Sequence, residues 1–193
     1  MYNKAGRKLC VQQVVFLEKE ENAMDFLTLA KARYSCKKFS DKPVEKEKLE
    51  QVLEAGRLAP TAKNNQPQHI YVLSSKESLA LTDQLTPCRY GAPVVLAVAH
   101  DKANVFEYPG GAYNSGAEDA AIVATHLVLA AKSVGLDTCW LNFFDPDKAK
   151  ELLQLPKNEE LTILIDVGYP DAAAKPLPNH DSRKPLSETV TYR

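Results

Sequence analysis

At 193 residues, the chain is long enough to bury a full hydrophobic core as one domain. Its hydrophobic share of 45% and charged share of 25% are those of an ordinary soluble globular protein. A net charge of −1 disfavours a nucleic-acid partner, which needs a strongly basic face, and no apolar run approaches the roughly 18–20 residues of a membrane span. Four cysteines without a CxxC pair favour a reducing, cytoplasmic location over a disulfide framework.

The first 23 residues differ from the rest of the chain. Their apolar stretch, from Leu9 to Leu17, is interrupted by polar residues and is followed by no small-residue cleavage site, which disfavours a signal peptide. A second candidate start lies at Met24, directly before the first helical pattern. Residues 1–23 are therefore either a translated leader or an N-terminal arm that packs on a partner subunit, and residues 24–193 are expected to form a single domain.

From Met24 onward, hydrophobic periodicity predicts an alternation of helices and strands. The first short helix is expected to turn Phe26 and Leu27 inward. The mixed order of elements indicates an α+β (mixed α/β) class, with a central mixed or antiparallel sheet of four to five strands flanked by helices. Helices are predicted over 24–32, 45–58, 76–85, 118–134 and 147–154, and strands over 69–74, 92–99, 138–143 and 161–167.

The tail from Tyr169 to Arg193 has a different character. It contains four prolines, no amphipathic helix, and only a short strand candidate near residues 189–192. A compact monomer rarely carries such a long segment without secondary structure of its own. An extended arm that crosses to a second subunit explains the tail better, so the sequence predicts a homodimer with exchanged C-terminal arms.

Three separated polar clusters, at 33–39, 59–67 and 182–186, could together hold a phosphate that is joined to a planar heterocycle. Fixed cations with hydrogen-bond forks suit the phosphate, and amide groups suit the edge of the ring. Each cluster alone is also typical of a solvated surface or a turn. The cationic, hydroxyl and amide groups are those of Arg33, Lys37, Arg183, Ser35, Asn64 and Gln66.

Other polar residues have simpler explanations. Glu118 and Asp119 could form an acid–base pair, but at the start of a helix they are explained by the helix dipole. Cys139 lies in a predicted strand and is expected to be a buried small hydrophobe. The histidines have no metal-ligand spacing, so no metal site is expected.

The three clusters, in this order, resemble the motifs of the FMN-dependent nitroreductase family, and the similarity runs from near Met24 to the C-terminus. Segment 135–141 is also similar to the Gly-Leu-x-x-Cys-Trp strand of that family. Three positions depart from the family pattern. Gln68 stands where Trp is frequent, Asn142 where many members have Gly, and Asp181 where some carry a second cation.

The resemblance implies two FMN sites at a homodimer interface, each built from both chains and covered by the C-terminal arm. Arg33, Ser35 and Arg183 would hold the phosphate, and Lys37 would lie near the flavin pyrimidine as an electrostatic group. A backbone N–H from segment 142–144 is expected near flavin N5. The cofactor-binding residues expected in all are Arg33, Tyr34, Ser35, Lys37, Pro60, Thr61, Asn64, Gln66, Asn142, Phe143 and Arg183.

The function that the resemblance implies is the passage of a hydride from NAD(P)H through FMN to an electron-poor small molecule, such as a nitroaromatic or a quinone. No catalytic side chain is then required, because the flavin is the reactive centre. NAD(P)H would be a transient donor, since the chain has neither GxGxxG nor GxxxxGK[ST]. The alternatives are another flavin chemistry, such as reductive dehalogenation or flavin fragmentation, and a flavin-binding sensor or carrier without turnover. A last alternative is a degenerate scaffold that binds no flavin, which the departures at Gln68 and Asp181 leave open.

Overall fold

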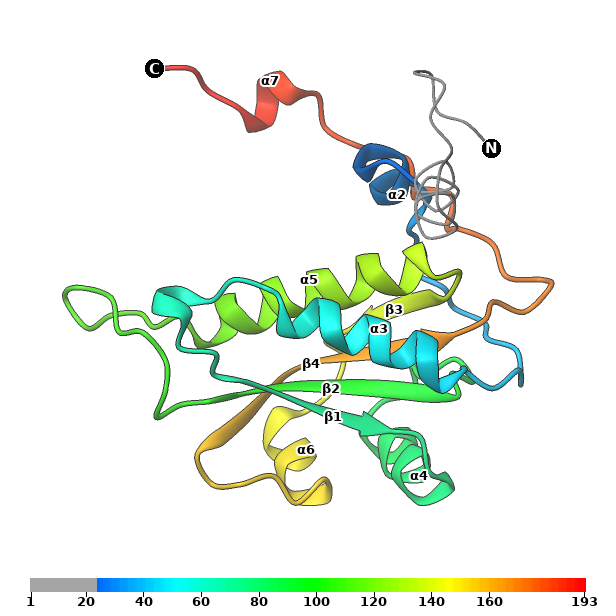
Figure 1. The fold of residues 1–193 in the computed structure, drawn as a ribbon, viewed down its shortest axis with the longest axis horizontal. Helices are drawn as coiled ribbons and strands as arrows, with labels where there is room; N and C mark the ends of the chain where they lie inside the picture. Colours follow the sequence, from blue (N-terminus) through cyan, green and yellow to red (C-terminus); the bar gives the residue numbers. More distant parts are fainter. Residues whose placement is uncertain (1–23) are drawn as a thin grey trace, which may run out of the picture.

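The structure is a computed structural model that describes residues 24–193 (Figure 1). The predictions for residues 1–23 lie outside the described residues. The helices are α2 (Phe26–Ala32), α3 (Lys46–Arg57), α4 (Lys76–Leu85), α5 (Gly116–Ser133), α6 (Pro146–Leu152) and α7 (Leu186–Thr189), with a 3₁₀ turn η1 at Ala62–Asn64. The strands are β1 (Gln68–Leu73), β2 (Val94–Asp101), β3 (Asp137–Leu141) and β4 (Glu159–Gly168).

The four strands form one antiparallel sheet in the order β1-β2-β4-β3. The central strands β2 and β4 are buried almost along their whole length, which explains their nearly continuous apolar sequences. A register shift between Val98 and Ala99 marks an irregularity in their pairing. The predicted α+β class is confirmed, and the sheet has the lower of the two expected strand numbers.

Two helical layers cover the sheet (Figure 1). Helices α3 and α5 pack on one face over a core that includes Leu96 and Ile165, whereas α4 and α6 lie on the other face, where Val95 and Leu164 are buried. Helices α3 and α5 approach closely at Gly56. A Cβ there would lie only 2.6 Å from Leu127 Cδ2, so the contact has no room for a side chain.

Side-chain caps define where several helices begin. Asp25 accepts hydrogen bonds from the backbone N–H groups of Leu27 and Thr28, each at 3.1 Å, and Ser75 caps α4 in the same way. Helix α5 ends before Gly135, whose φ of 80° is a left-handed conformation that glycine adopts freely. These local signals explain why the predicted helix boundaries lie close to the observed ones.

Helix α2 stands beside the end of α5 and away from the sheet (Figure 1). Phe26 and Leu27 are both 66% exposed, and α2 contains no buried residue. The prediction that these side chains face inward is wrong for the single chain. Helical periodicity identifies an apolar face, but it cannot say whether the same chain supplies the surface that covers it.

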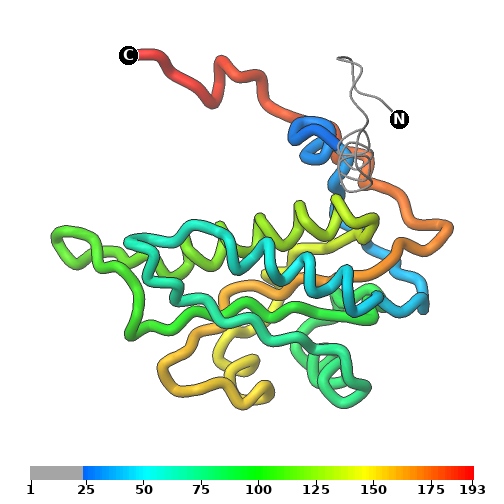
Figure 2. The backbone as a smooth tube through the Cα atoms, in the orientation of Figure 1, coloured from blue at the N-terminus to red at the C-terminus, as the bar shows by residue number. Residues whose placement is uncertain are grey.

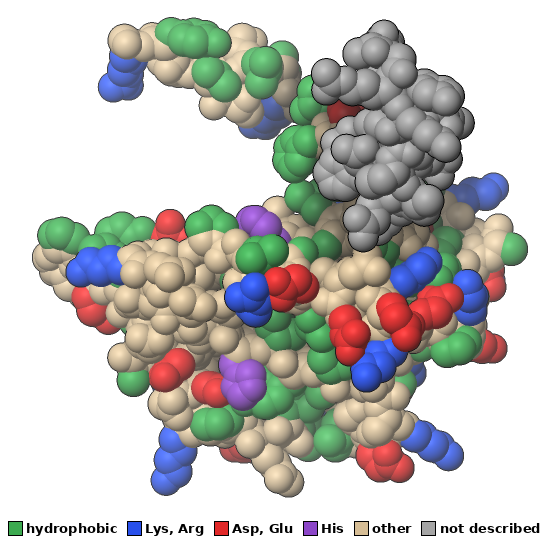
Figure 3. Space-filling model, viewed as in Figure 1, with side chains coloured by type: hydrophobic (Ala, Val, Ile, Leu, Met, Phe, Trp, Pro, Cys, Tyr) green, Lys and Arg blue, Asp and Glu red, His purple; other side chains and the backbone are tan. Residues whose placement is uncertain are grey.

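The C-terminal segment leaves the layered body and stands clear of it (Figures 2 and 3). The predicted strand near residues 189–192 is wrong, because the segment has no sheet edge beside it: Thr189 is the last residue of the short helix α7, and residues 190–192 have no regular secondary structure. Leu186 and Tyr192 are 77% and 95% exposed, and Figure 3 shows hydrophobic side chains along this part of the chain. No helix within residues 24–193 is long and apolar enough to cross a membrane.

Candidate functional site

Segment 33–39 runs beside the start of β3 in an extended conformation. The N–H of Cys36 donates to the carbonyl of Thr138 at 2.9 Å, and Ser35 forms a parallel bridge with the same residue. Side chains of an extended segment alternate between its two sides. Arg33, Ser35 and Lys37 accordingly face a surface groove, while Cys36 is fully buried.

Three adjoining cavities of about 110, 140 and 340 Å³ make up this groove. Ser35 lines all three, so we call it the Ser35 groove. The two smaller cavities both contain Arg33, and the largest contains Lys37. One cation therefore lies on each side of the Ser35 hydroxyl. The other lining residues used below are Tyr90, Cys139, Trp140, Asn142, Phe143, Leu177 and His180.

Aromatic side chains line the part of the groove that contains Lys37. The Lys37 ammonium lies 5.7 Å from the centre of the Tyr90 ring, and Trp140 is fixed by a 2.7 Å hydrogen bond from its indole N–H to Asn142 Oδ1. Phe143 is 72% exposed. The aromatic side chains of this surface can stack on the face of a planar heterocycle. Arg33 and the Ser35 hydroxyl are suited to a phosphate that is attached to it.

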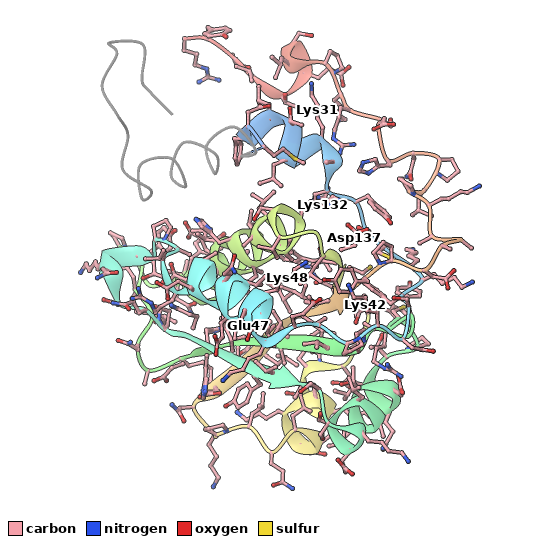
Figure 4. All side chains as sticks on the ribbon, turned by 45° about the vertical axis from the view of Figure 1, so that its right-hand side comes forward. Lys31, Lys42, Glu47, Lys48, Lys132 and Asp137 are labelled. Atoms are coloured by element: carbon pink, nitrogen blue, oxygen red, sulfur yellow. The ribbon has the colours of Figure 1, made fainter. Side chains whose placement is uncertain are left out.

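A buried polar network lies behind the groove. The Lys132 ammonium is 2.6 Å from Asp137 Oδ1 and 5.4 Å from the Tyr34 ring (Figure 4). Burial and a hydrogen bond to Asp137 raise the pKa of the Tyr34 phenol. Tyr34 also packs edge-on against His180, with ring centres 6.2 Å apart. Tyr34 is therefore placed to hold its neighbours in position, and its predicted contact with a cofactor stays a prediction.

Arg183 lies next to the groove without lining it. Its guanidinium donates to the carbonyl of Ser182 at 2.7 Å and also to that of His180, which lines the smallest cavity. The neighbouring Asp181 side chain is 99% exposed. Arg183 is thus linked to the groove only through His180, and its guanidinium is directed to the backbone of its own segment.

The second polar cluster has a strained backbone. Lys63, Asn64 and Gln66 have φ values of 53°, 55° and 53°, which are unusual for residues other than glycine. The Thr61 hydroxyl accepts from the N–H of Gln66 at 3.0 Å, and Asp119 accepts from the N–H of Ala62 at 2.8 Å. Strain of this kind persists where the surroundings enforce it and is concentrated at functional sites.

Asp119 has a role that its position at a helix start does not reveal. Its carboxylate is 1% exposed and accepts from both the N–H of Ala62 and, at 2.7 Å, the hydroxyl of Ser115. It thereby joins α5 to the turn that presents Thr61 and Pro60. The helix dipole does not account for the bond between Ala62 and Asp119, because these residues are 57 positions apart in the sequence.

One chain does not bring the two clusters together. Ala62 is bonded to Asp119 at the start of α5, whereas Ser35 is bridged to Thr138, just beyond its end. Helix α5 has 18 residues and is therefore about 27 Å long. Figure 1 accordingly shows η1 at one end of the α3–α5 layer and segment 33–45 at the other.

The three departures from the family pattern have different surroundings. Gln68 begins β1 opposite His100, and its buried Oε1 has no hydrogen-bond partner within residues 24–193. Asn142 holds the Trp140 indole, as described above. Gln68 and the exposed Asp181 therefore lie outside the Ser35 groove, whereas Asn142 contributes to its wall.

A buried carboxyl lies directly behind the groove wall. Asp166 of β4 is 0% exposed and pairs across the sheet with Cys139, which lines the largest cavity. Neither Asp166 oxygen has a hydrogen-bond partner in residues 24–193. Burial raises the pKa of Asp166 to about 9, and burial together with the nearby Asp166 carboxyl raises that of the Cys139 thiol to about 12. The expectation that Cys139 is a buried small side chain is confirmed.

Several residues of the groove were not predicted from the sequence. Trp140 follows the buried Cys139 in β3, so strand alternation could have placed it on the outer side. Tyr90, Leu177 and His180 come from irregular segments, and no sequence pattern points to them. Tyr90 reaches the groove because its carbonyl accepts from the N–H of Phe39 at 3.1 Å.

The fold and groove define an α+β protein whose sheet has helices on both faces, with a cationic, aromatic-lined binding surface, and comparisons with known proteins agree with this class. The family model described as the nitroreductase family matches residues 30–87 and 82–169. The chain belongs to the nitroreductase family.

Individual relatives extend over most of the chain. A nitroreductase family protein from Clostridium difficile 630 has a solved structure with a TM-score of 0.82 and 38% identity, covering 88% of this chain and 98% of its own. An Archaeoglobus fulgidus protein, provisionally named NADH dehydrogenase/NAD(P)H nitroreductase, is 30% identical over 75% of this chain and 84% of its own length. The structure of an FMN-dependent nitroreductase from C. difficile R20291 has a TM-score of 0.69 and 25% identity, with coverages of 86% and 98%.

The burial of Asp166 predicts a pH-dependent stability. An unfolded aspartate has a pKa near ~3.9, so between pH ~4 and ~9 the unfolded chain releases a proton that the folded chain keeps. The contribution of Asp166 to stability is therefore fully present below pH ~4 and is lost as pH rises through this window, by up to about 1.4 kcal/mol per pH unit. Asn does not titrate, so the stability of Asp166→Asn lacks this pH dependence. The free energy of unfolding of the variant should therefore increase relative to that of the native protein as pH rises.

Urea unfolding of both proteins between pH 5 and pH 9, read by circular dichroism, measures the difference. Asp41→Asn, on the exposed surface, controls for the removal of one carboxyl group. A difference between native protein and Asp166→Asn that does not change with pH would show that Asp166 is not held protonated.

Proposed function

We propose that the chain is an FMN-dependent oxidoreductase that transfers reducing equivalents from NAD(P)H to an electron-poor small molecule. The Ser35 groove is the observation that carries this proposal, because it joins the Arg33 and Ser35 groups to an aromatic surface that contains Lys37. This combination fits FMN, which has a phosphate at one end and a planar ring system at the other. The FMN-dependent C. difficile relative supports the choice of cofactor.

Each groove residue has a distinct role in holding the cofactor. Arg33 and the Ser35 hydroxyl bind the phosphate, with Arg183 able to join them if its guanidinium leaves the carbonyls of its own segment. Lys37 places positive charge beside the ring, and the 142–144 backbone offers an N–H at the groove edge. Bound FMN supplies the hydride and electron chemistry, so these residues bind, orient and tune it.

The site requires two chains. The second cluster lies at the start of α5 and the Ser35 groove beyond its end, and the helix between them is about 27 Å long, so one chain cannot apply both clusters to one FMN. The exposed apolar side chains of α2 and α7, among them Phe26, Leu27 and Leu186, need a partner to cover them. A homodimer with exchanged C-terminal arms satisfies both requirements, with the second cluster of one chain beside the groove of the other.

The acceptor is proposed by its chemistry. A hydride acceptor that stacks on an exposed flavin must be flat and electron-poor, as nitroaromatics and quinones are, and Phe143 offers an exposed ring beside this position. The relative from A. fulgidus supports NAD(P)H as the donor through its name. We propose that the protein acts in the cytoplasm on small molecules of this class.

Reconstitution with FMN tests the proposal directly. The purified protein should show flavin absorbance bands, either as isolated or after incubation with FMN. The bands should bleach on anaerobic addition of NADH or NADPH and return with a nitroaromatic or a quinone. Repeated turnover would exclude a sensor or carrier, which is reduced once and stops, and failure to bind FMN would refute the proposed cofactor.

Subunit complementation tests the two-chain site. Arg33→Glu reverses the charge of the groove, and Asn64→Asp changes the second cluster while keeping a residue that tolerates its left-handed φ. Each variant alone should lose FMN binding by at least about tenfold. A co-expressed mixed dimer contains one site with both native clusters, so it should bind about half as much FMN as the native dimer.

Differently tagged chains allow the mixed dimer to be purified for the FMN titration. The control is a mixture of the two separately purified variants, titrated before their subunits have had time to exchange. A mixed dimer without tight binding would mean that each site takes both clusters from one chain or does not use the second cluster.

Lys37→Met tests the electrostatic role of Lys37. Reduction adds negative charge to FMN, which the Lys37 ammonium stabilises. The variant should therefore lower the midpoint potential of bound FMN more than it weakens the binding of oxidised FMN. Anaerobic redox titration and fluorescence titration measure the two effects. Lys38→Met, at the exposed neighbouring position, is the matched control, and an unchanged potential in Lys37→Met would contradict the role.

A further inference from the structure

Asp166 combines three features that the proposed function does not use. Its carboxyl is fully buried, both of its oxygens are without a hydrogen-bond partner in residues 24–193, and it lies one strand away from the largest cavity of the Ser35 groove. An unpaired charged carboxylate in such a place is costly. The buried side chains around it on the same face of the sheet are apolar, among them Leu164 of β4 and Val95, which lies opposite Asp166 on β2.

The groups around Asp166 leave it unpaired. Arg89 is the nearest cation, but its guanidinium donates to both Asp83 oxygens, at 2.6 and 2.7 Å, and to the carbonyl of Ala92 at 2.8 Å. The other titratable groups that act on Asp166 or on the neighbouring Cys139 are the Asp83 carboxyl, which is paired with Arg89, the thiols of Cys36, Cys88 and Cys139, and the phenol of Tyr90.

The path from Asp166 to the groove is short. Asp166 and Cys139 are directly opposite residues of neighbouring antiparallel strands, whose side chains lie on the same face about 5 Å apart at Cβ. Cys139 and Lys37 line the same cavity, and Lys37 also acts on the thiol of Cys139 electrostatically. A charge on Asp166 would therefore act on the same volume as the Lys37 ammonium, through a buried region that screens it poorly.

We propose that Asp166 is a positioning residue for charge, which stays protonated so that Lys37 alone sets the sign of the potential at the inner end of the Ser35 groove. The residue acts through Lys37 and touches neither cofactor nor substrate. Ionised Asp166 would oppose the Lys37 ammonium and disfavour negative charge in the groove. This inference rests on the proposed binding of FMN in the groove.

The test is a redox titration of FMN bound to the native protein and to Asp166→Asn, from pH 7 to pH 10. Asn is neutral at every pH and has nearly the same shape, and Asp166→Leu is a second neutral variant should the Asn protein fold poorly. Above pH ~9, where Asp166 ionises, the native protein should favour reduced over oxidised FMN about tenfold less than the variant does. For two electrons this corresponds to a potential about 30 mV lower.

The native and variant curves should therefore run in parallel up to pH ~8 and separate above it. Titration of the flavin ring itself occurs in both proteins and cancels in the comparison. A lower potential of the native protein already at pH 7, with a urea-unfolding difference that does not depend on pH, would show an ionised Asp166 and overturn the inference. Curves that coincide up to pH 10, although urea unfolding shows that Asp166 ionises in this range, would overturn it too, because the charge would then not act on the groove. Both results leave FMN binding intact. Absence of FMN binding to the native protein would instead refute the proposed function, and the inference with it.

Discussion

The pairing of segment 33–39 with the start of β3 is the contact on which the candidate site depends. One backbone hydrogen bond, from Cys36 to Thr138, fixes the register, and a shift by one residue would reverse the side chains of the whole segment. The buried Cys36 and the Tyr34–Asp137 interaction oppose such a shift. Arg33, Ser35 and Lys37 can line one groove because Tyr34 and Cys36, which alternate with them, point to the other side of the segment, toward the protein interior.

Local signals in the sequence were sufficient for most of the fold. Helical spacing predicted α4 with its observed bounds, and the apolar run from Ala92 to Ala99 predicted β2 as a strand that is covered on both faces. Failures occurred where the outcome depends on a surface outside the segment. The apolar face of α2 and the strand expected at 189–192 both required a neighbour that the single chain does not provide.

The same distinction applies to the site. Arg33, Ser35 and Lys37 could be predicted together because an extended segment presents alternate residues on one side. Tyr90 and Leu177 could not, since loop positions depend on long-range contacts that no periodicity records. Asp166 is the reverse case. An acidic residue inside an apolar strand pattern is visible in the sequence, but only the structure shows that its oxygens lack partners.

Among the described residues, Lys37 is the one cation that lines the largest cavity of the Ser35 groove. The proposed roles of Lys37 and Asp166 together explain how this single cation can favour the reduced, negatively charged form of a bound cofactor. In a region that excludes water, one ammonium has a large effect only if no carboxylate nearby cancels it. Burial of Asp166 costs folding stability at neutral pH, and a Val or Leu would avoid that cost. Asp166 is compatible with the groove because its buried carboxyl behind Cys139 holds its proton up to pH ~9 and so leaves the Lys37 ammonium unopposed.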